Sequence, residues 1–260
     1  MSNLIGRDNE IGLIKAYINE MKSFHIYGHE GAGKTAILEY IFNHWDDLRS
    51  PLIPIFCRTS ATLREILLRI AGFILYRTGN LQNIDKFKQI HQIRYQSDLK
   101  TVNSRDMKNI IFRNMKYKNF CVILDRLDYV TPKINALLVP LDEAAVLITS
   151  SRQSWEIADY SFRGKLDYCL YLFPKLRIGN LKRKDAFILM ENLSSNMSVN
   201  FPNKPQTFEE IFHISKGNPR TIVEILDKAK QPQYVTGDSL NLNLIMIDCR
   251  IDNIGEGGHP

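Results

Sequence analysis

One segment near the N-terminus combines glycines, a lysine and a threonine at a spacing that suits phosphate chemistry. Residues 28–35 read Gly-His-Glu-Gly-Ala-Gly-Lys-Thr and fit the pattern G-x-x-x-x-G-K-[ST] in full. Glycines let backbone N–H groups surround an anion without Cβ clashes, and a following helix presents its positive end. In such a loop the lysine contacts the β- and γ-phosphates and the threonine hydroxyl binds Mg²⁺. The predicted nucleotide contacts in this segment are Gly28, His29, Glu30, Gly31, Ala32, Gly33, Lys34, Thr35 and Ala36. The segment predicts binding of ATP with Mg²⁺.

A second carboxylate is needed to hold the metal, and an aspartate follows a buried apolar run further along the chain. Val122-Ile123-Leu124 precedes Asp125, as in a Walker B strand. We therefore expect Thr35 and Asp125 to be the metal ligands. The catalytic residues predicted on this basis are Lys34, Asp125 and Asp128.

The residue after Asp125 affects the prediction of turnover. Many ATPases with such a loop carry a glutamate there to polarise the attacking water. This chain has Arg126 instead, whose guanidinium is never a base at neutral pH. Asp128 could activate water if the turn brings it round, and Glu30 is a weaker candidate. The sequence therefore predicts hydrolysis that is slow, absent or dependent on a partner.

A third apolar run, Val146–Thr149, is followed by Ser150, Ser151 and Arg152. Ligands of open α/β sheets bind outside the carboxyl ends of the strands. Ser150 or Ser151 could therefore sense the γ-phosphate, and Arg152 could reach it.

Strand and helix patterns alternate through the first two thirds of the chain, which is typical of a parallel sheet with crossover helices. Strands are predicted at residues 24–27, 52–57, 120–124, 144–149 and 168–173, with Pro54 favouring an edge position for the second. Helices are predicted at residues 8–22, 34–45, 62–76 (capped by Ser60), 84–99 and 104–115. The expected fold class is α/β, a five-stranded parallel P-loop core in three α/β/α layers.

From about Leu181 the pattern predicts helices only, at residues 183–193, 207–215 and 219–230. After Gln231, apolar residues alternate from Leu240 to about Asp248, which favours a strand. The expected organisation is a core over residues 1–176, a small helical lid over 177–230 and a strand-like tail over 231–260.

Composition restricts the remaining possibilities. No stretch approaches the length of a membrane span, and no signal peptide is visible, so a cytoplasmic protein is expected. The four cysteines have no C-x-x-C spacing, which favours buried reduced thiols. A net charge of +6 and a pI near 9.0 are compatible with a polyanionic partner.

Five features occur in the order found in the AAA+ and STAND groups of P-loop ATPases, which this chain resembles over residues 3–230. They are residues 5–10 (Ile-Gly-Arg-Asp-Asn-Glu), the glycine-rich loop, Leu124-Asp125, residues 148–152 (Ile-Thr-Ser-Ser-Arg) and residues 217–220 (Gly-Asn-Pro-Arg). The first is similar to the V-G-R-E-x-E box of these domains, and residues 176–190 look like the boundary between core and lid. Residues 215–226 resemble both the G-x-P motif of STAND proteins and the sensor 2 helix of origin-recognition ATPases.

The resemblance implies roles for further residues. Ile5, Gly6 and Arg7 would lie near the adenine, Pro219 near the base, and Arg220 would touch the phosphates from the lid. Arg163 lies where related oligomeric ATPases often present an arginine finger, although an ordinary loop arginine is the commoner case.

Two functions from different classes follow. One is an ATP-dependent switch of the AAA+/STAND type, acting on a protein partner or through self-assembly. The other is a DNA-acting ATPase that resembles origin-recognition initiators or transposon target selectors of the TnsC and TniB kind. The second is favoured by basic residues between the second and third strands, which also suit an ordinary solvated helix face: Lys86, Lys88, Arg94, Lys100, Arg105, Lys108, Arg113, Lys116 and Lys118, with His91, Tyr95 and Tyr117 among them. A metabolic kinase is a weaker third alternative, because no small-substrate site is evident.

Overall fold

The computed structural model describes residues 4–77, 84–115, 119–156, 169–197, 203–236 and 239–256. The chain divides into two compact units. The first, called here the sheet unit, contains residues 9–28 and 34–178; the second, the helical unit, contains the chain up to Asp8, residues 29–33 and the chain from Gly179 onward. The middle of the glycine-rich loop is therefore grouped with the helical unit.

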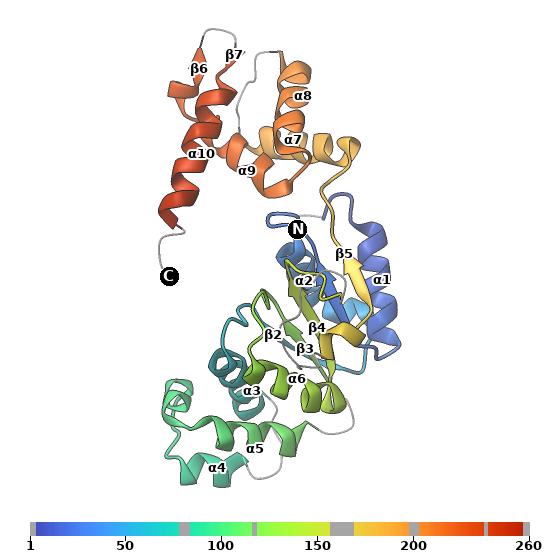
Figure 1. The fold of residues 1–260 in the computed structure, drawn as a ribbon, viewed down its shortest axis with the longest axis vertical. Helices are drawn as coiled ribbons and strands as arrows, with labels where there is room; N and C mark the ends of the chain where they lie inside the picture. Colours follow the sequence, from blue (N-terminus) through green and yellow to red (C-terminus); the bar gives the residue numbers. More distant parts are fainter. Residues whose placement is uncertain are drawn as a thin grey trace. The chain divides into compact units, whose positions relative to one another are not determined.

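The sheet unit is built on five parallel strands (Figure 1). Their order is β2-β3-β4-β1-β5, so β2, which contains Pro54, lies at an edge as its proline predicts. The strands are β1 (Phe24–Tyr27), β2 (Ile53–Cys57), β3 (Phe120–Leu124), β4 (Val146–Ser151) and β5 (Lys175–Arg177).

The helices accompanying the sheet cover both of its faces. They are α1 (Asp8–Asn19), α2 (Lys34–Asn43), α3 (Leu63–Arg77), α4 (Ile84–Ile90), α5 (Ser104–Asn114) and α6 (Pro132–Ala144). Ile55, Val122 and Leu147 are register partners and pack in one cluster with buried residues of α3, α5 and α6.

The next residues along these strands point to the opposite face, because side chains alternate along a strand. On that face Phe24 contacts Tyr17 of α1 and Phe56 contacts Phe42 of α2, with ring centroids 5.1 and 5.4 Å apart. The fold class predicted from the sequence, a five-stranded parallel α/β core in three layers, is confirmed. That the helices after it act as a lid stays a prediction.

The helical unit consists of α7 (Arg183–Met197), α8 (Lys204–Ser215), α9 (Pro219–Lys228), a short hairpin of β6 (Val235–Thr236) and β7 (Ser239–Leu240), and α10 (Leu242–Glu256). Its core is a single apolar cluster to which all four helices contribute, among them Met190, Ile211, Ile225 and Ile245. None of the helices in the described ranges is long and apolar enough to cross a membrane.

The strand predicted in the tail is wrong, because residues 242–256 form α10. Leu242, Ile245 and Cys249 are buried in the cluster of the helical unit, and their spacing of three and four residues is that of a helix face. The alternation read from the sequence was misleading, since Leu244 and Ile247 are apolar but exposed. Tertiary packing, which the local pattern does not contain, selects the helix.

The strand predicted at residues 168–173 is also wrong. Cys169–Leu172 is a 3₁₀ turn, and the fifth strand is β5, which follows Pro174; Tyr168 lies outside the described residues. A short apolar run fits a strand and a buried helical turn equally well. Of the three residues of β5 only Leu176 is buried, so β5 leaves no apolar run in the sequence.

Two smaller helix predictions also need correction. Thr62, rather than Ser60, caps α3: its hydroxyl accepts from the Glu65 N–H, and the Glu65 carboxylate accepts from the Thr62 N–H. The helix predicted over residues 84–99 ends at Ile90, and residues 96–101 form a 3₁₀ turn.

The four cysteines are free thiols in low-dielectric surroundings. Cys57, Cys121 and Cys249 are buried, and Cys169 is partly buried. Burial raises the pKa of Cys57 and of Cys169 to about 12, and it also raises the pKa of Cys121 and of Cys249. All four are therefore protonated at neutral pH.

Candidate nucleotide-binding site

The glycine-rich loop connects β1 to α2 and has a backbone that only glycine adopts without strain at three of its positions. Gly28, Gly31 and Gly33 have φ values of 155°, 76° and 98°. A Cβ at Gly33 would meet no atom within 4 Å beyond its chain neighbours, so the backbone there faces open space. The Lys34 ammonium donates to the Gly28 carbonyl at 2.7 Å, which keeps its positive charge against the loop.

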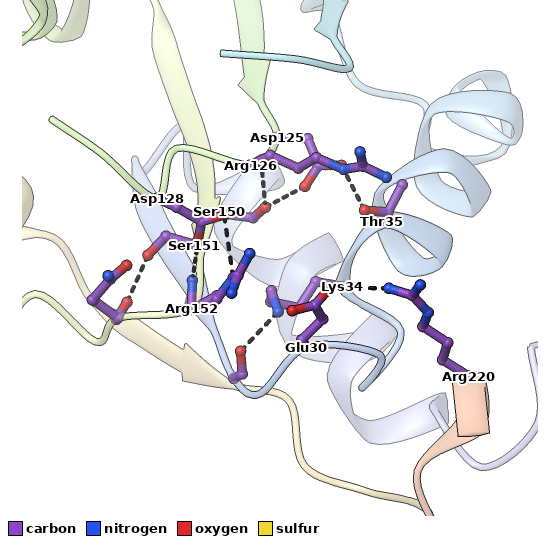
Figure 2. Close-up of polar contacts among 12 residues, drawn as sticks. Glu30, Lys34, Thr35, Asp125, Arg126, Asp128, Ser150, Ser151, Arg152 and Arg220 are labelled. Carbon is purple, nitrogen blue, oxygen red and sulfur yellow. Dashed lines mark hydrogen bonds and ion pairs between the residues drawn. The ribbon is translucent and has the colours of Figure 1, made fainter. Parts of the chain in front are cut away.

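A buried carboxylate stands beside the first turn of α2 (Figure 2). Asp125 directly follows β3 and is 1% exposed. The Thr35 hydroxyl donates to Asp125 Oδ2 at 2.6 Å, and the Ser150 hydroxyl of the neighbouring strand β4 donates to Asp125 Oδ1. The Asp125 N–H donates to the Cys57 carbonyl at 3.0 Å. Three adjacent strands thus fix this carboxylate.

The oxygens of Thr35 and Asp125 fit a magnesium ion. Mg²⁺ prefers oxygen ligands at 2.0–2.1 Å in octahedral geometry, which places neighbouring ligands about 2.9 Å apart. Thr35 Oγ1 and Asp125 Oδ2 are 2.6 Å apart, so a small outward movement of each would admit the ion. These are the two metal ligands predicted from the sequence, and the structure brings them together.

Arg126 is held in an uncommon backbone conformation. Its φ is 57°, in the left-handed region that few non-glycine residues adopt, and its N–H donates to Ser150 Oγ at 3.2 Å. The side chain is exposed, and in Figure 2 it extends from the end of β3 toward the side on which Thr35 lies. The position of the usual catalytic glutamate therefore presents a permanent positive charge.

Both carboxylate oxygens of Asp128, the alternative base, contact Arg152. Its Oδ1 accepts from the Arg152 N–H at 2.6 Å, and its Oδ2 lies 3.7 Å from Arg152 Nε. Asp128 therefore fixes the loop that follows β4. This arrangement favours a positioning role over that of a base.

Ser150 and Ser151 have different surroundings. Ser150 contacts Asp125, as described above, but the Ser151 hydroxyl donates to the Gln153 carbonyl at 2.7 Å and accepts from Trp155 Nε1 at 3.0 Å. Of the two serines suggested by the sequence, only Ser150 takes part in the Asp125 cluster.

His25 forms a polar cluster inside the sheet that sequence reasoning missed. Its ring nitrogens lie 2.8 Å from Thr149 Oγ1 and 2.9 Å from the Gln153 carbonyl. Burial lowers the pKa of His25 to about 4, against the opposing effect of the Gln153 carbonyl. The ring is thus neutral, and donation to Gln153 places the proton on Nε2. A single histidine within an apolar strand gave no signal of this role.

In the helical unit, a buried arginine supports the middle of the glycine-rich loop. Arg7 is 4% exposed, and its guanidinium donates to the carbonyls of Ala32 at 2.8 Å and Gly179 at 2.7 Å. Gly6, before it, has a φ of 65° and packs against Asp185. Arg7 therefore connects the loop to Gly179, where the C-terminal part of the helical unit begins.

The N-terminus of α9 contacts the same loop from a distant part of the sequence. Asn218 Nδ2 donates to the Glu30 carbonyl at 2.8 Å, while its Oδ1 caps α9 by accepting from Arg220 N–H at 3.1 Å and Thr221 N–H at 3.3 Å. The Arg220 N–H also lies 3.3 Å from the Gly31 carbonyl. A Cβ at Gly31 would overlap Asn218 and Arg220, so this approach requires glycine. The motif containing Asn218 was visible in the sequence, but its contact with the loop was not.

The Arg220 side chain is held by two carboxylates. Arg220 Nη1 lies 2.9 Å from Glu30 Oε1 of the loop (Figure 2). Arg220 Nε lies 2.6 Å from Glu224 Oε1 on α9. The Arg220 and Glu30 side chains are 44% and 56% exposed. Glu30 is thus an ion-pair partner of Arg220, which argues against its alternative role as a base.

The remaining predicted site residues stay predictions, and the structure gives their burial. Ile5 and Pro219 are partly buried, with Pro219 in the first position of α9, while His29 and Ala36 are exposed. Arg163, Lys116, Tyr117 and Lys118 lie outside the described residues.

No protein-family model matches this sequence, and a comparison with curated proteins gives no match. Solved structures with similar architecture include a Walker-type ATPase from Pyrococcus abyssi, which matches 97% of this chain and 74% of its own at 14% identity with a TM-score of 0.63. Drosophila ORC, in a structure bound to DNA, matches 95% of this chain and 67% of its own at 15% identity with a TM-score of 0.57. Identities this low show shared architecture only. The chain has the fold of the P-loop ATPases of the AAA+ group.

Proposed function

We propose that this chain binds ATP with Mg²⁺ and acts as a nucleotide-dependent switch whose hydrolysis is slow or stimulated by a partner. The observation that carries the proposal is the buried Thr35–Asp125–Ser150 cluster at the end of a glycine-rich loop. A carboxylate this deeply buried is costly unless it is paired or binds a cation. Thr35 and Asp125 supply ligands for Mg²⁺, and Lys34 supplies positive charge for the phosphates.

The proposal also gives roles to three further residues of the sheet unit: Ser150, Asp128 and Arg126. Ser150 orients the Asp125 carboxylate, and Asp128 holds Arg152 in place through its backbone and side chain. Arg126 adds positive charge without a proton acceptor, so it favours retention of a triphosphate over attack by water.

The switch itself lies in the contact between the loop and α9. Arg220 exchanges its Glu30 partner for the γ-phosphate when ATP is bound and returns to Glu30 with ADP. A protein partner, or another copy of this chain, would recognise the difference at α9. The two states differ in the contacts that the γ-phosphate offers, which is what a ligand-driven shift requires.

The test measures binding and turnover separately. A fluorescent ATP analogue should bind the wild-type protein more tightly with Mg²⁺ than with a chelator, and turnover should be slow. Arg126→Glu supplies the missing base, so turnover should rise about a hundredfold or more, as general-base catalysis typically contributes; Arg126→Gln should not produce this rise. Lack of ATP binding by the wild-type protein would refute the proposal.

A second function, DNA binding, is favoured by one feature of the sheet unit. The lining of a cavity of about 580 Å³ at the carboxyl end of β2 includes Arg58, Arg69 and Lys100, together with one acidic residue, Glu65. Arg58 also lies 3.2 Å from Glu39 of α2, the helix that begins with Lys34 and Thr35. A phosphate backbone bound in this cavity would be positioned to influence the nucleotide site.

DNA binding can be tested by its salt dependence. The affinity for a DNA duplex should fall steeply between about 50 and 200 mM salt, because phosphate contacts release counterions. Arg69→Gln combined with Lys100→Gln should reduce the steepness, while Lys15→Gln together with Lys133→Gln controls for net charge. Affinity that does not respond to salt would exclude this second function.

A further inference from the structure

We propose that Glu30 lowers the affinity of the site for ATP relative to ADP, because its carboxylate competes with the γ-phosphate for Arg220. The inference rests on the proposed function, since it requires that the loop bind nucleotide. Glu30 is then a specificity-determining residue: it weakens ATP binding selectively and leaves ADP binding nearly unchanged.

The geometry pairs Arg220 with a carboxylate of the loop to which the proposed function assigns the phosphates. Glu30 is part of the loop itself, two residues before Ala32, and its Oε1 lies 2.9 Å from Arg220 Nη1. A carboxylate and a phosphate offer a guanidinium the same kind of acceptor oxygens at the same kind of distance. An anion bound by the loop backbone would therefore compete with Glu30 for the same guanidinium.

The arginine can change partners without undocking α9. Asn218 donates to the Glu30 carbonyl and the Arg220 N–H approaches the Gly31 carbonyl, and both contacts use atoms other than the Glu30 carboxylate. Glu224, one turn along α9, holds Arg220 Nε and leaves Nη1 directed to Glu30. The side-chain ion pair is thus a separate, half-exposed contact within a docked loop.

The two nucleotides differ in what they require of this ion pair. ATP gains the γ-phosphate contact with Arg220 only when the Glu30 pair breaks. ADP has no γ-phosphate, so the pair stays intact when it binds. An exposed ion pair contributes roughly 0.2–1 kcal/mol, so removal of Glu30 should strengthen ATP binding about 1.4- to fivefold.

Simple repulsion predicts a different pattern. The negative charge of Glu30 would also repel a bound nucleotide, and removing it would strengthen the binding of both nucleotides. That effect would persist when Arg220 is absent. Competition for Arg220 requires the arginine, so a double-mutant cycle separates the two explanations.

The experiment measures the dissociation constants of ATP and ADP, both with Mg²⁺, for the wild-type protein, Glu30→Gln, Arg220→Gln and the double variant. Glu191→Gln is the matched control: it removes a carboxylate that is 55% exposed, against 56% for Glu30, from another ion pair of the helical unit, with Lys204. Thermal unfolding verifies that each variant is folded.

We expect Glu30→Gln to raise the ratio of ATP to ADP affinity about 1.4- to fivefold, with ADP binding nearly unchanged. In the Arg220→Gln background the same substitution should leave the ratio unchanged, as should Glu191→Gln. Equal strengthening of both nucleotides, a gain that persists without Arg220, or no change in the ratio would each overturn the inference while leaving ATP binding intact. If the wild-type protein binds neither nucleotide, the proposed function fails, and the inference fails with it.

Discussion

Two groups of polar residues in this chain differ in their exposure to water. In the sheet unit, Asp125, Ser150 and His25 are almost completely buried and have fixed hydrogen-bond partners. In the helical unit, Glu30 and Arg220 form an ion pair whose side chains are about half exposed. Water therefore screens only the second group effectively.

The difference in exposure between the two groups means that the loss of a partner has a different energetic cost in each. Loss of one partner of a buried charge costs several kcal/mol, because the group left behind has neither water nor protein to satisfy it. Loss of an exposed ion pair costs at most about 1 kcal/mol. Buried residues are therefore suited to nucleotide binding, and exposed residues to a choice between states of similar energy.

The largest effect is expected for Asp125→Asn. The substitution removes the charged metal ligand from a buried cluster, so the affinity for ATP with Mg²⁺ should fall about a thousandfold, equivalent to about 4 kcal/mol. Titration with a fluorescent nucleotide, with Mg²⁺ and with a chelator, measures this. Asp227→Asn, in an exposed pair with Lys230, is the control and should bind normally. An unchanged dependence on Mg²⁺ would show that Asp125 is not a metal ligand.

The second effect is acid destabilisation through His25. Its pKa is lowered to about 4 in the folded chain from an ordinary value of 6.5, so the unfolded chain takes up the proton first. The stability contributed by neutral His25 is present above pH 6.5 and is lost as the pH falls toward 4, by about 3 kcal/mol. Urea unfolding across this range should show the loss in the wild-type protein and a smaller one in His25→Gln. Equal slopes would contradict the buried neutral ring.

The third effect concerns Asn218, whose side chain both caps α9 and holds the loop. Asn218→Ala should cost about 1 kcal/mol of stability as a lost cap and weaken ATP binding about fivefold through the lost Glu30 carbonyl contact. Asn241 accepts from the Leu244 N–H at the start of α10, so Asn241→Ala loses a comparable cap without a loop contact. Thermal unfolding and nucleotide titration together separate the two roles. Equal nucleotide affinities of the two variants would remove Asn218 from the site.

The smallest effect is expected for Lys204→Gln, which breaks the exposed pair with Glu191. Stability should change by less than about 0.5 kcal/mol and nucleotide affinity should not change. Urea unfolding at low and high salt provides the measurement. A loss of more than about 1 kcal/mol in the free energy of unfolding would mean that exposure alone does not make an ion pair such as Glu30–Arg220 weak.

The sequence predicted features that depend on local chemistry. The phosphate loop and Asp125 were predictable because each motif lies between recognisable elements, and neighbouring parallel strands end at the same edge of a sheet. The partner of Asp128 was not predictable, since Arg152 lies 24 residues further along the chain, beyond α6 and β4. The same limit applies to Asn218, whose loop contact spans 188 residues. The helix α10 was missed because its period is set by the cluster on which it packs.

The cysteines have a practical consequence for measuring the switch. Alkylating probes react with the thiolate, and the raised pKa values keep Cys57, Cys121, Cys169 and Cys249 as slow-reacting thiols. Cysteines introduced at exposed positions such as Lys133 and Glu191 should therefore be labelled in preference to the native ones. A donor–acceptor dye pair at these two sites, one in each unit, would report their separation with ATP and with ADP, without prior removal of the native thiols.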